Sequence, residues 1–77
     1  MQTTKDPALV KLGENIRKSR ETRKISQEEL AELADLDRTY VGGVERGERN
    51  LTILSTLKLC RALEVELSDL VQGVKRG

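Results

Sequence analysis

The sequence predicts an all-α protein, and three observations support this fold class. Leucine is the main apolar residue, phenylalanine and tryptophan are absent, and no β-branched run suggests a strand. Ser26 and Glu29 form the S-x-x-E pattern of a helical capping box. Apolar residues also recur at the three- and four-residue spacing of amphipathic helices. The length of 77 residues fits one domain with a small core.

The first helix is expected from Pro7 to about Thr22. Asp6 is a good N-cap, and proline is favoured at the first helical position. One face of this helix carries the apolar residues Leu9, Leu12 and Ile16. Gly13 costs about 1 kcal/mol relative to alanine in a helix, which suggests close packing against a neighbouring helix there. Residues 1–6 are expected to form a disordered tail.

Arg20 lies on the continuation of this apolar face, where a charged group needs a partner. We expect an ion pair with Glu45, which lies near the inner flank of a later helix. The alternative is that Arg20 sits at the edge of the core and extends its charge into solvent.

Two short helices with a tight turn are predicted at about 26–46, the arrangement of a helix-turn-helix. Ser26 caps the first helix, and its apolar face is formed by Leu30, Ala31 and Ala34. Asp37 is positioned to cap the second helix, which runs to about Arg46. Gly47 then supplies the usual C-terminal stop.

The second helix of this pair has two contrasting faces. Val41 and Val44 point inward, and the opposite side is formed by Arg38, Thr39, Gly42, Gly43 and Arg46. Glycines allow close approach, and arginines supply forked donors for guanine edges and phosphates. The pattern therefore predicts a helix that reads a DNA groove. The alternative is that Gly42 and Gly43 mark a kink or an early helix end.

The following loop carries Arg49 and Asn50, which could reach a phosphate or could belong to an ordinary polar loop. Thr52 can cap a further helix over 53–63. Its apolar residues cover an arc of roughly 220° at 100° per residue, wider than one small core requires. Cys60 lies in that arc and is expected to be a buried hydrophobe. A last short helix is expected to be capped by Ser68 and to carry Leu70, Val71 and Val74.

The wide apolar arc predicts a subunit interface in the region of about 51–74. The domain is therefore expected over residues 7–74, with a second tail at 75–77. The net charge of +1 is weak evidence on partners, so any DNA-binding face must come from locally gathered donors.

The composition also excludes several classes of site. Without histidine and with one cysteine, the chain has neither an internal disulfide nor a zinc site of the usual kinds. We find no phosphate-cradling glycine loop and no nucleophile–base pair. We therefore expect neither an enzyme nor a metal or other cofactor. No apolar run spans a membrane and no signal-peptide pattern is visible, so a cytoplasmic location is expected.

Four segments resemble, in order and spacing, the lambda-repressor-like (Cro/CI, XRE) helix-turn-helix family. They are LGENIRKSR, SQEELAELA, YVGGVERG and ALEVELSDL, within about Leu12 to Leu70. The run LDRTYVGGVERGERNLTI is similar to the controller proteins of restriction–modification systems. The resemblance implies a compact five-helix DNA-binding domain and a homodimer on a palindromic operator. It also implies regulation of the protein's own gene and of the endonuclease gene.

The resemblance also assigns roles to individual residues. Base contacts are expected from Arg38, Thr39, Tyr40 and Gly43. Phosphate contacts are expected from Gln27, Arg46, Arg49 and Asn50, with Arg20 as a further candidate beside its ion pair. The expected dimer contacts are Leu54, Leu57, Val65, Leu67 and Val71. The chain departs from many relatives at Gly42, often serine, and at Thr56, often leucine; the second change is expected to weaken the core locally.

Double-stranded DNA and a second copy of the chain are the expected partners, and RNA polymerase is a further candidate. Two other classes of function stay open from the sequence. One is an antitoxin-type or phage-type regulator of the same family, and the other is a helical protein-interaction module without DNA binding.

Overall fold

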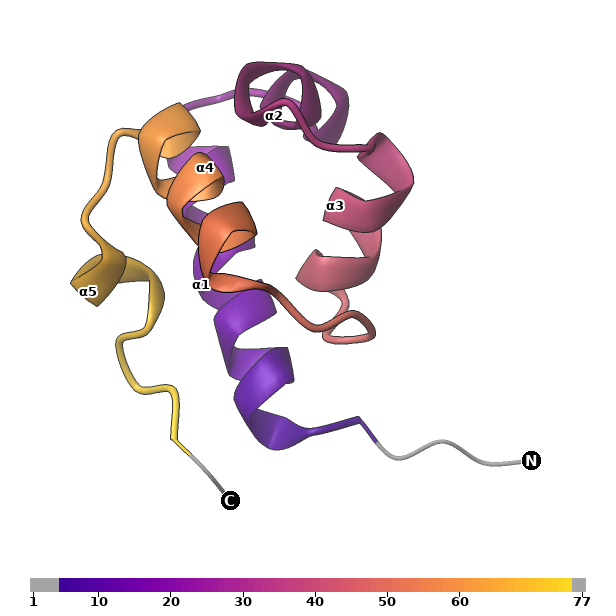
Figure 1. Ribbon diagram of the computed structural model, residues 1–77. Helices are drawn as coiled ribbons and strands as arrows, with labels where there is room; N and C mark the ends of the chain where they lie inside the picture. The colour runs from indigo at the N-terminus through magenta and orange to yellow at the C-terminus, as the bar shows by residue number, and fades with distance from the viewer. Residues whose placement is uncertain (1–4, 76–77) are drawn as a thin grey trace.

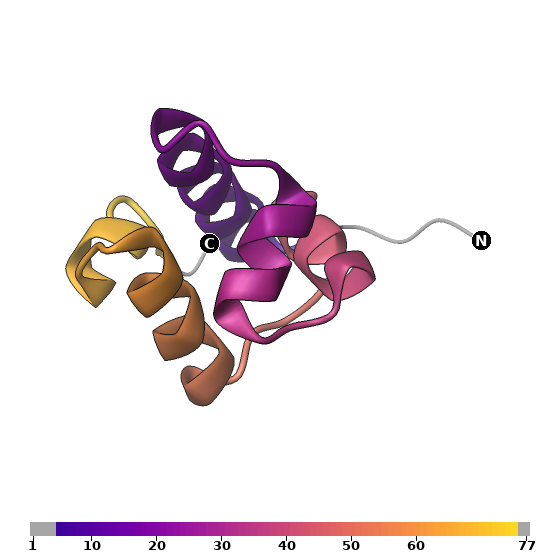
Figure 2. The same ribbon diagram turned by 90° about the horizontal axis from the view of Figure 1, so that it is seen from above.

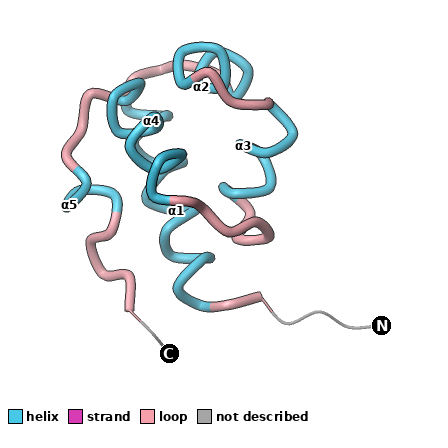
Figure 3. Tube along the Cα trace, viewed as in Figure 1, coloured by secondary structure: helices cyan, strands magenta, loops and turns pink. Residues whose placement is uncertain are grey.

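A computed structural model of the protein describes residues 5–75 and contains five α-helices in that range. Figure 1 shows them in chain order: α1 (Pro7–Thr22), α2 (Gln27–Ala34), α3 (Arg38–Glu45), α4 (Ile53–Leu63) and α5 (Leu67–Leu70). Loops join the helices, and no strand occurs between residues 5 and 75 (Figure 3). The prediction of an all-α, five-helix domain is confirmed. Most of each predicted tail falls outside the described residues.

Four helices begin where their capping residues predict. Asp6 accepts from the Ala8 N–H at 2.9 Å, and Asp37 accepts from the Thr39 N–H at 2.8 Å. Ser26 and Glu29 form the reciprocal capping box, with hydrogen bonds of 3.0 and 2.8 Å. The hydroxyl of Thr52 accepts from the Ser55 N–H at 3.0 Å. These bonds satisfy N–H groups that have no partner within their own helix.

The prediction for the last helix was wrong at both ends. Helix α5 begins at Leu67, with Glu66 rather than Ser68 as its N-cap residue. The Glu66 N–H donates to the Asp69 carboxylate at 2.8 Å, so the acidic residue three positions on stabilises the earlier start. The helix ends at Leu70, and Val74 lies beyond it, after Gly73 in the left-handed region with φ 75°.

The core lies between α1 and the other helices. Helix α1 contacts α3, α4 and α5, and α2 packs on α3 and α4. The large side chains with less than 2% exposure are Ile16, Leu30, Val41, Leu59, Leu63 and Leu70, with Val44 at 2%. Figures 1 and 2 place α2 and α3 on one side of the molecule and α5 on the other. The helix predicted to read DNA is thus separated from the C-terminal helix.

Gly13 allows α1 to approach α3 closely, as the sequence suggested. A Cβ at Gly13 would lie 2.6 Å from the Glu45 carbonyl oxygen, closer than real Cβ atoms come to such a group. Any larger residue at position 13 would force α1 and the C-terminal end of α3 apart.

Candidate nucleic-acid interface

Helix α3 is held by one face and exposes the other. Val41 and Val44 are 1% and 2% exposed and lie in the core. Arg38 and Thr39, at the N-terminal end of α3, are exposed, and Tyr40 is half-buried. The predicted division of this helix into an apolar and a polar side is therefore present, and its first two residues face solvent.

Glu45, at the end of α3, is the centre of a buried polar network. Its side chain is 2% exposed and accepts from Arg20 Nε at 2.7 Å and Arg20 Nη2 at 3.0 Å. Gln27 Nε2 donates to the same carboxylate at 2.9 Å. The hydrogen bond to Glu45 raises the pKa of Arg20 above its ordinary value, so the guanidinium stays charged. The network links α1, the start of α2 and the end of α3.

Of the two roles predicted for Arg20, the structure favours the ion pair. Its side chain is 13% exposed, and Nη1 donates to the Ile25 carbonyl at 2.9 Å in addition to the bonds with Glu45. Nitrogen atoms that already have buried partners are poor candidates for a phosphate contact. Gln27 Nε2 also donates to Glu45, at 2.9 Å. Gln27 differs from Arg20 in its place, since it lies at the first position of α2, where free backbone N–H groups favour an anion.

Gly42 and Gly43 both lie inside α3, which continues to Glu45, so the alternative of an early helix end is wrong. Both glycines are buried. An ideal Cβ on Gly42 would lie 3.2 Å from Arg46 Nη1, and one on Gly43 would lie 2.5 Å from Arg49 Cγ. The expected bare glycine surface is therefore covered by arginine side chains. A base could touch Gly43 directly only if Arg49 moved aside.

The loop after α3 is tied back to the helix by Tyr40. The Tyr40 hydroxyl donates to the Asn50 carbonyl at 2.8 Å, and the Arg49 guanidinium carbon lies 5.3 Å from the centre of the tyrosine ring. This is the geometry of a cation–π contact. Sequence reasoning missed both contacts, although the single aromatic residue of the chain was a signal that this ring has a particular role.

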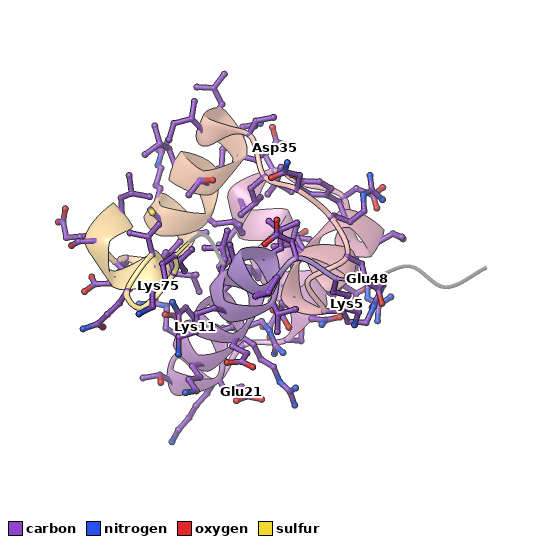
Figure 4. All side chains as sticks on the ribbon, turned by 90° about the horizontal axis from the view of Figure 1, so that it is seen from below. Lys5, Lys11, Glu21, Asp35, Glu48 and Lys75 are labelled. Atoms are coloured by element: carbon purple, nitrogen blue, oxygen red, sulfur yellow. The ribbon has the colours of Figure 1, made fainter. Side chains whose placement is uncertain are left out.

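Arg46 forms an exposed ion pair that the sequence analysis also missed. Its Nε donates to Glu48 at 3.0 Å, and Lys5 Nζ lies 3.5 Å from the other oxygen of that carboxylate (Figure 4). The hydrogen bond from Arg46 lowers the pKa of Glu48. Exposed pairs of this kind contribute little to stability, so a phosphate can replace Glu48 as the partner of Arg46. Arg49 and Asn50 are exposed beside it.

Apolar side chains are exposed on α4 and near α5. Four of the five predicted dimer contacts belong to this set: Leu54 at 69%, Leu57 at 47%, Leu67 at 37% and Val71 at 40%. Val65 differs, because it is half-buried and packs against the core. Ile53, the first residue of α4, is 61% exposed and was not predicted as a dimer contact.

Two polar groups of α4 are accommodated in the core. Thr56 is buried, and its hydroxyl donates to the Thr52 carbonyl at 2.8 Å, so the expected local weakening is offset by a satisfied hydrogen bond. Cys60 is 7% exposed, and burial raises the pKa of its thiol. The cysteine is a core residue, as the apolar arc predicted.

Within residues 5–75, no group of three or more histidine, cysteine, aspartate or glutamate residues is placed to hold a metal ion. In the same range, every helix is too short or too polar to cross a membrane.

Known proteins share both the sequence pattern and this geometry. Residues 16–70 match the protein family described as Helix-turn-helix. Control protein C.SmaI of Serratia marcescens is 46% identical over 66 residues, which cover 83% of this chain and 79% of the relative.

Two solved structures agree with this relationship. The restriction-modification controller protein C.AhdI from Aeromonas hydrophila superimposes with a TM-score of 0.79 at 52% identity, over 80% of this chain and 94% of that chain. C.Esp1396I bound to a 19 base pair DNA duplex gives a TM-score of 0.79 at 38% identity, over 88% and 91% of the two chains. The chain therefore belongs to the helix-turn-helix family, and its relatives there include the controller proteins of restriction–modification systems.

Proposed function

We propose that this protein is a restriction–modification controller that binds a palindromic operator as a homodimer. In this role it regulates its own gene and the endonuclease gene. The observation that carries the proposal is helix α3, whose buried side is locked into the core while Arg38 and Thr39 stand exposed at its N-terminal end. A helix-turn-helix presents its recognition helix to the major groove through these first residues.

Base recognition is assigned to the start of α3. The forked guanidinium of Arg38 can donate two hydrogen bonds to the O6 and N7 atoms of a guanine. Thr39 offers a hydroxyl and a methyl group to the next base edge, and Tyr40 lies beside them at the wall of the groove. The fixed position of α3 keeps these side chains in register with the DNA.

Phosphate contacts are assigned to residues on both sides of α3. Gln27 stands at the N-terminus of α2, while Arg46, Arg49 and Asn50 follow the C-terminal end of α3. Such contacts set the register of a protein on the duplex and carry no direct sequence information. This arrangement needs donors at particular positions rather than a large excess of basic residues, which is compatible with a net charge of +1.

Dimerisation is assigned to the exposed apolar residues of α4 and α5 and to Val71 just after α5. Leu54, Leu57, Leu67 and Val71 stay in contact with water in a single chain, and covering them would enlarge the core of a small domain. Two copies joined at this end would each present α3 away from the interface, and the two α3 helices must lie about 34 Å apart, one turn of DNA, to reach both half-sites.

RNA polymerase is the third partner in this proposal, after DNA and a second copy of the chain. A regulator bound next to a promoter either contacts the polymerase or blocks its access, and the resemblance to controller proteins implies that the number of bound dimers decides between the two.

The proposal is tested by titrating the protein against a duplex from upstream of its own gene and against a shuffled duplex, at two salt concentrations. Tight binding to the upstream duplex supports an operator reader if the affinity falls with salt less steeply than it would if phosphate contacts supplied all of the binding. Equal, weak and strongly salt-dependent binding to both duplexes contradicts the proposal.

The solution mass tests the homodimer separately. A stable mass of two chains supports the regulator. A monomer that aggregates points instead to a missing protein partner, as expected for an antitoxin.

A further inference from the structure

Gly43 is covered by the stem of one side chain. A Cβ built on Gly43 would lie 2.5 Å from Cγ of Arg49, 3.5 Å from its Cδ and 3.6 Å from its Cβ. Three consecutive carbons of Arg49 therefore lie along α3 at Gly43, the second of the two adjacent glycines of that helix. The space that any other residue would occupy is filled by this arginine.

The position of the stem determines the position of the charge. From this position against Gly43, the Arg49 side chain places its guanidinium over the Tyr40 ring, with the central guanidinium carbon 5.3 Å from the ring centre. Tyr40 is itself held, because its hydroxyl donates to the Asn50 carbonyl at 2.8 Å. Tyr40 lies three residues before Gly43 on α3, so the ring and the glycine are neighbours on one side of the helix.

The cost of Gly43 to the helix requires an explanation. Glycine in a helix interior is less favourable than alanine, and the flanking Val41 and Val44 face the core rather than this side. Close approach of DNA cannot account for the glycine in this arrangement, because Arg49 lies between Gly43 and any ligand. The contact with the Arg49 stem does account for it.

We infer that Gly43 is a positioning residue: it lets the Arg49 side chain pack against α3 and stack its guanidinium on Tyr40. The positive charge of Arg49 is thereby ordered, before DNA binds, beside the end of the helix that reads the DNA. This role rests on the proposed function for its effect on DNA binding, whereas the placement of Arg49 is independent of that function. A side chain with many rotamers loses less freedom on binding when it is already ordered in the free protein.

Gly43→Ala tests the placement, with Gly42→Ala as its matched control. Both substitutions replace one of two adjacent helical glycines and carry the same gain in helix propensity. A Cβ at Gly42 would meet only the far ends of flexible side chains, Arg46 Nη1 at 3.2 Å and Gln27 Oε1 at 3.4 Å. A Cβ at Gly43 would displace the stem of Arg49.

The readout is the proton NMR shift of the Arg49 side chain. Tyr40 is the only aromatic residue of the chain, and there is no histidine, so any ring-current shift at Arg49 comes from Tyr40. We expect upfield-shifted Arg49 side-chain protons in the wild type and in Gly42→Ala, and ordinary shifts in Gly43→Ala. Retention of the shift in Gly43→Ala would overturn the inference.

A stability cycle tests the same contact without NMR. Gly43→Ala in an Arg49→Ala background no longer meets the stem and keeps its gain in helix propensity, so it should raise the Tm of Arg49→Ala. In the wild-type background the same change should raise the Tm less or lower it. An equal effect on Tm in both backgrounds would show that the Arg49 stem does not pack against Gly43.

The DNA-binding cycle tests the functional part. With the operator duplex, Gly43→Ala and Arg49→Ala should each weaken binding by about tenfold, and the double variant should be little worse than either, because both disturb one contact. Additive losses would contradict a shared role. If the wild type binds no operator, the proposed function fails, and the NMR shift and the stability cycle still decide the placement of Arg49.

Discussion

Arg20 and Glu45 join α1 to the C-terminal end of α3 through two parallel hydrogen bonds, from Arg20 Nε at 2.7 Å and from Nη2 at 3.0 Å. The Glu45 side chain is 2% exposed, and the pair is completed by Gln27 at 2.9 Å. The same end of α3 meets α1 at Gly13, where the two backbones come close. The orientation of the proposed recognition helix therefore depends on a charged contact that does not face DNA.

Arg20→Ala should reduce the free energy of unfolding by about 3 kcal/mol, because it leaves the Glu45 carboxylate buried without its charged partner. Urea unfolding measures the loss. Arg17→Ala is the control, since Arg17 pairs with Glu21 at 3.1 Å on the exposed side of the same helix. That pair should contribute less than about 0.5 kcal/mol. Equal losses in the two variants would contradict a special role for the buried pair.

Arg38→Ala should weaken binding to the operator by roughly 1–3 kcal/mol, the size of one lost guanine contact. Binding to random duplex should change little, because Arg38 is assigned to a base edge. Fluorescence anisotropy with both duplexes provides the comparison. Arg46→Ala, at a proposed phosphate contact, should lower both affinities and reduce the salt slope. If Arg38→Ala also lowered both affinities alike, its assignment to a base would be wrong.

Leu57→Glu should shift the homodimer towards monomer by at least about tenfold in Kd, because it places a charge in an apolar contact. Sedimentation equilibrium gives the constant. Leu33→Glu is a suitable control, since Leu33 is 61% exposed on α2, outside the proposed interface. It should leave the association unchanged. Dissociation caused by Leu33→Glu alone would place the interface elsewhere.

Asn15 should prove necessary for the order of the C-terminal segment. Its Nδ2 donates to the carbonyls of Leu70 and Gln72, both at 2.8 Å. Asn15→Ala should cost about 1 kcal/mol, and Asn15→Asp more, because a carboxylate would face two carbonyl oxygens. Hydrogen exchange at the Val71 and Val74 amides, which close the last turns, should accelerate in that order. Identical exchange in Asn15→Asp and the wild type would refute the prediction.

Stability should fall at alkaline pH through Cys60. Burial, with a smaller effect of Glu66 and Asp69, raises the pKa of this thiol in the folded state above its value in the unfolded chain. The thiol's contribution to stability is therefore complete below the unfolded pKa, about 8.5. It is lost as the pH rises past that value towards the folded-state pKa.

Unfolding of the wild type and of Cys60→Ala between about pH 7 and pH 10 isolates this effect, since the two chains share all other titrating groups. The advantage of the wild type over the variant should shrink as the pH rises. A constant advantage across this range would mean that the thiol does not titrate differently in the two states.

The positions of the helices followed from the sequence because their causes are local. Asp6, Ser26, Asp37 and Thr52 each bond a backbone N–H two or three residues away, and such pairs can be recognised in the chain itself. The error at α5 is local too, since Ser68 was predicted as the cap and Glu66, two residues earlier, is the N-cap residue. Asp69 stabilises the earlier start.

The two faces of α3 could also be predicted, since helical periodicity alone puts Val41 and Val44 on one side. The family pattern supplied the expected roles of the exposed residues. What covers that exposed side could not be predicted. The stacking of Arg49 on Tyr40 depends on the path of the loop after α3.

By itself, the sequence determined the helical fold, the helix-turn-helix and the place of Arg20 on the apolar face of α1. Each of these depends on neighbours three or four positions apart. The tertiary structure alone decided that Arg49 covers Gly43, that Val65 packs inward while Leu57 stays exposed, and that Asn15 holds Leu70 across 55 residues of sequence. These contacts join residues of different helices or of a helix and a loop, so they exist only when the whole chain has packed around its core.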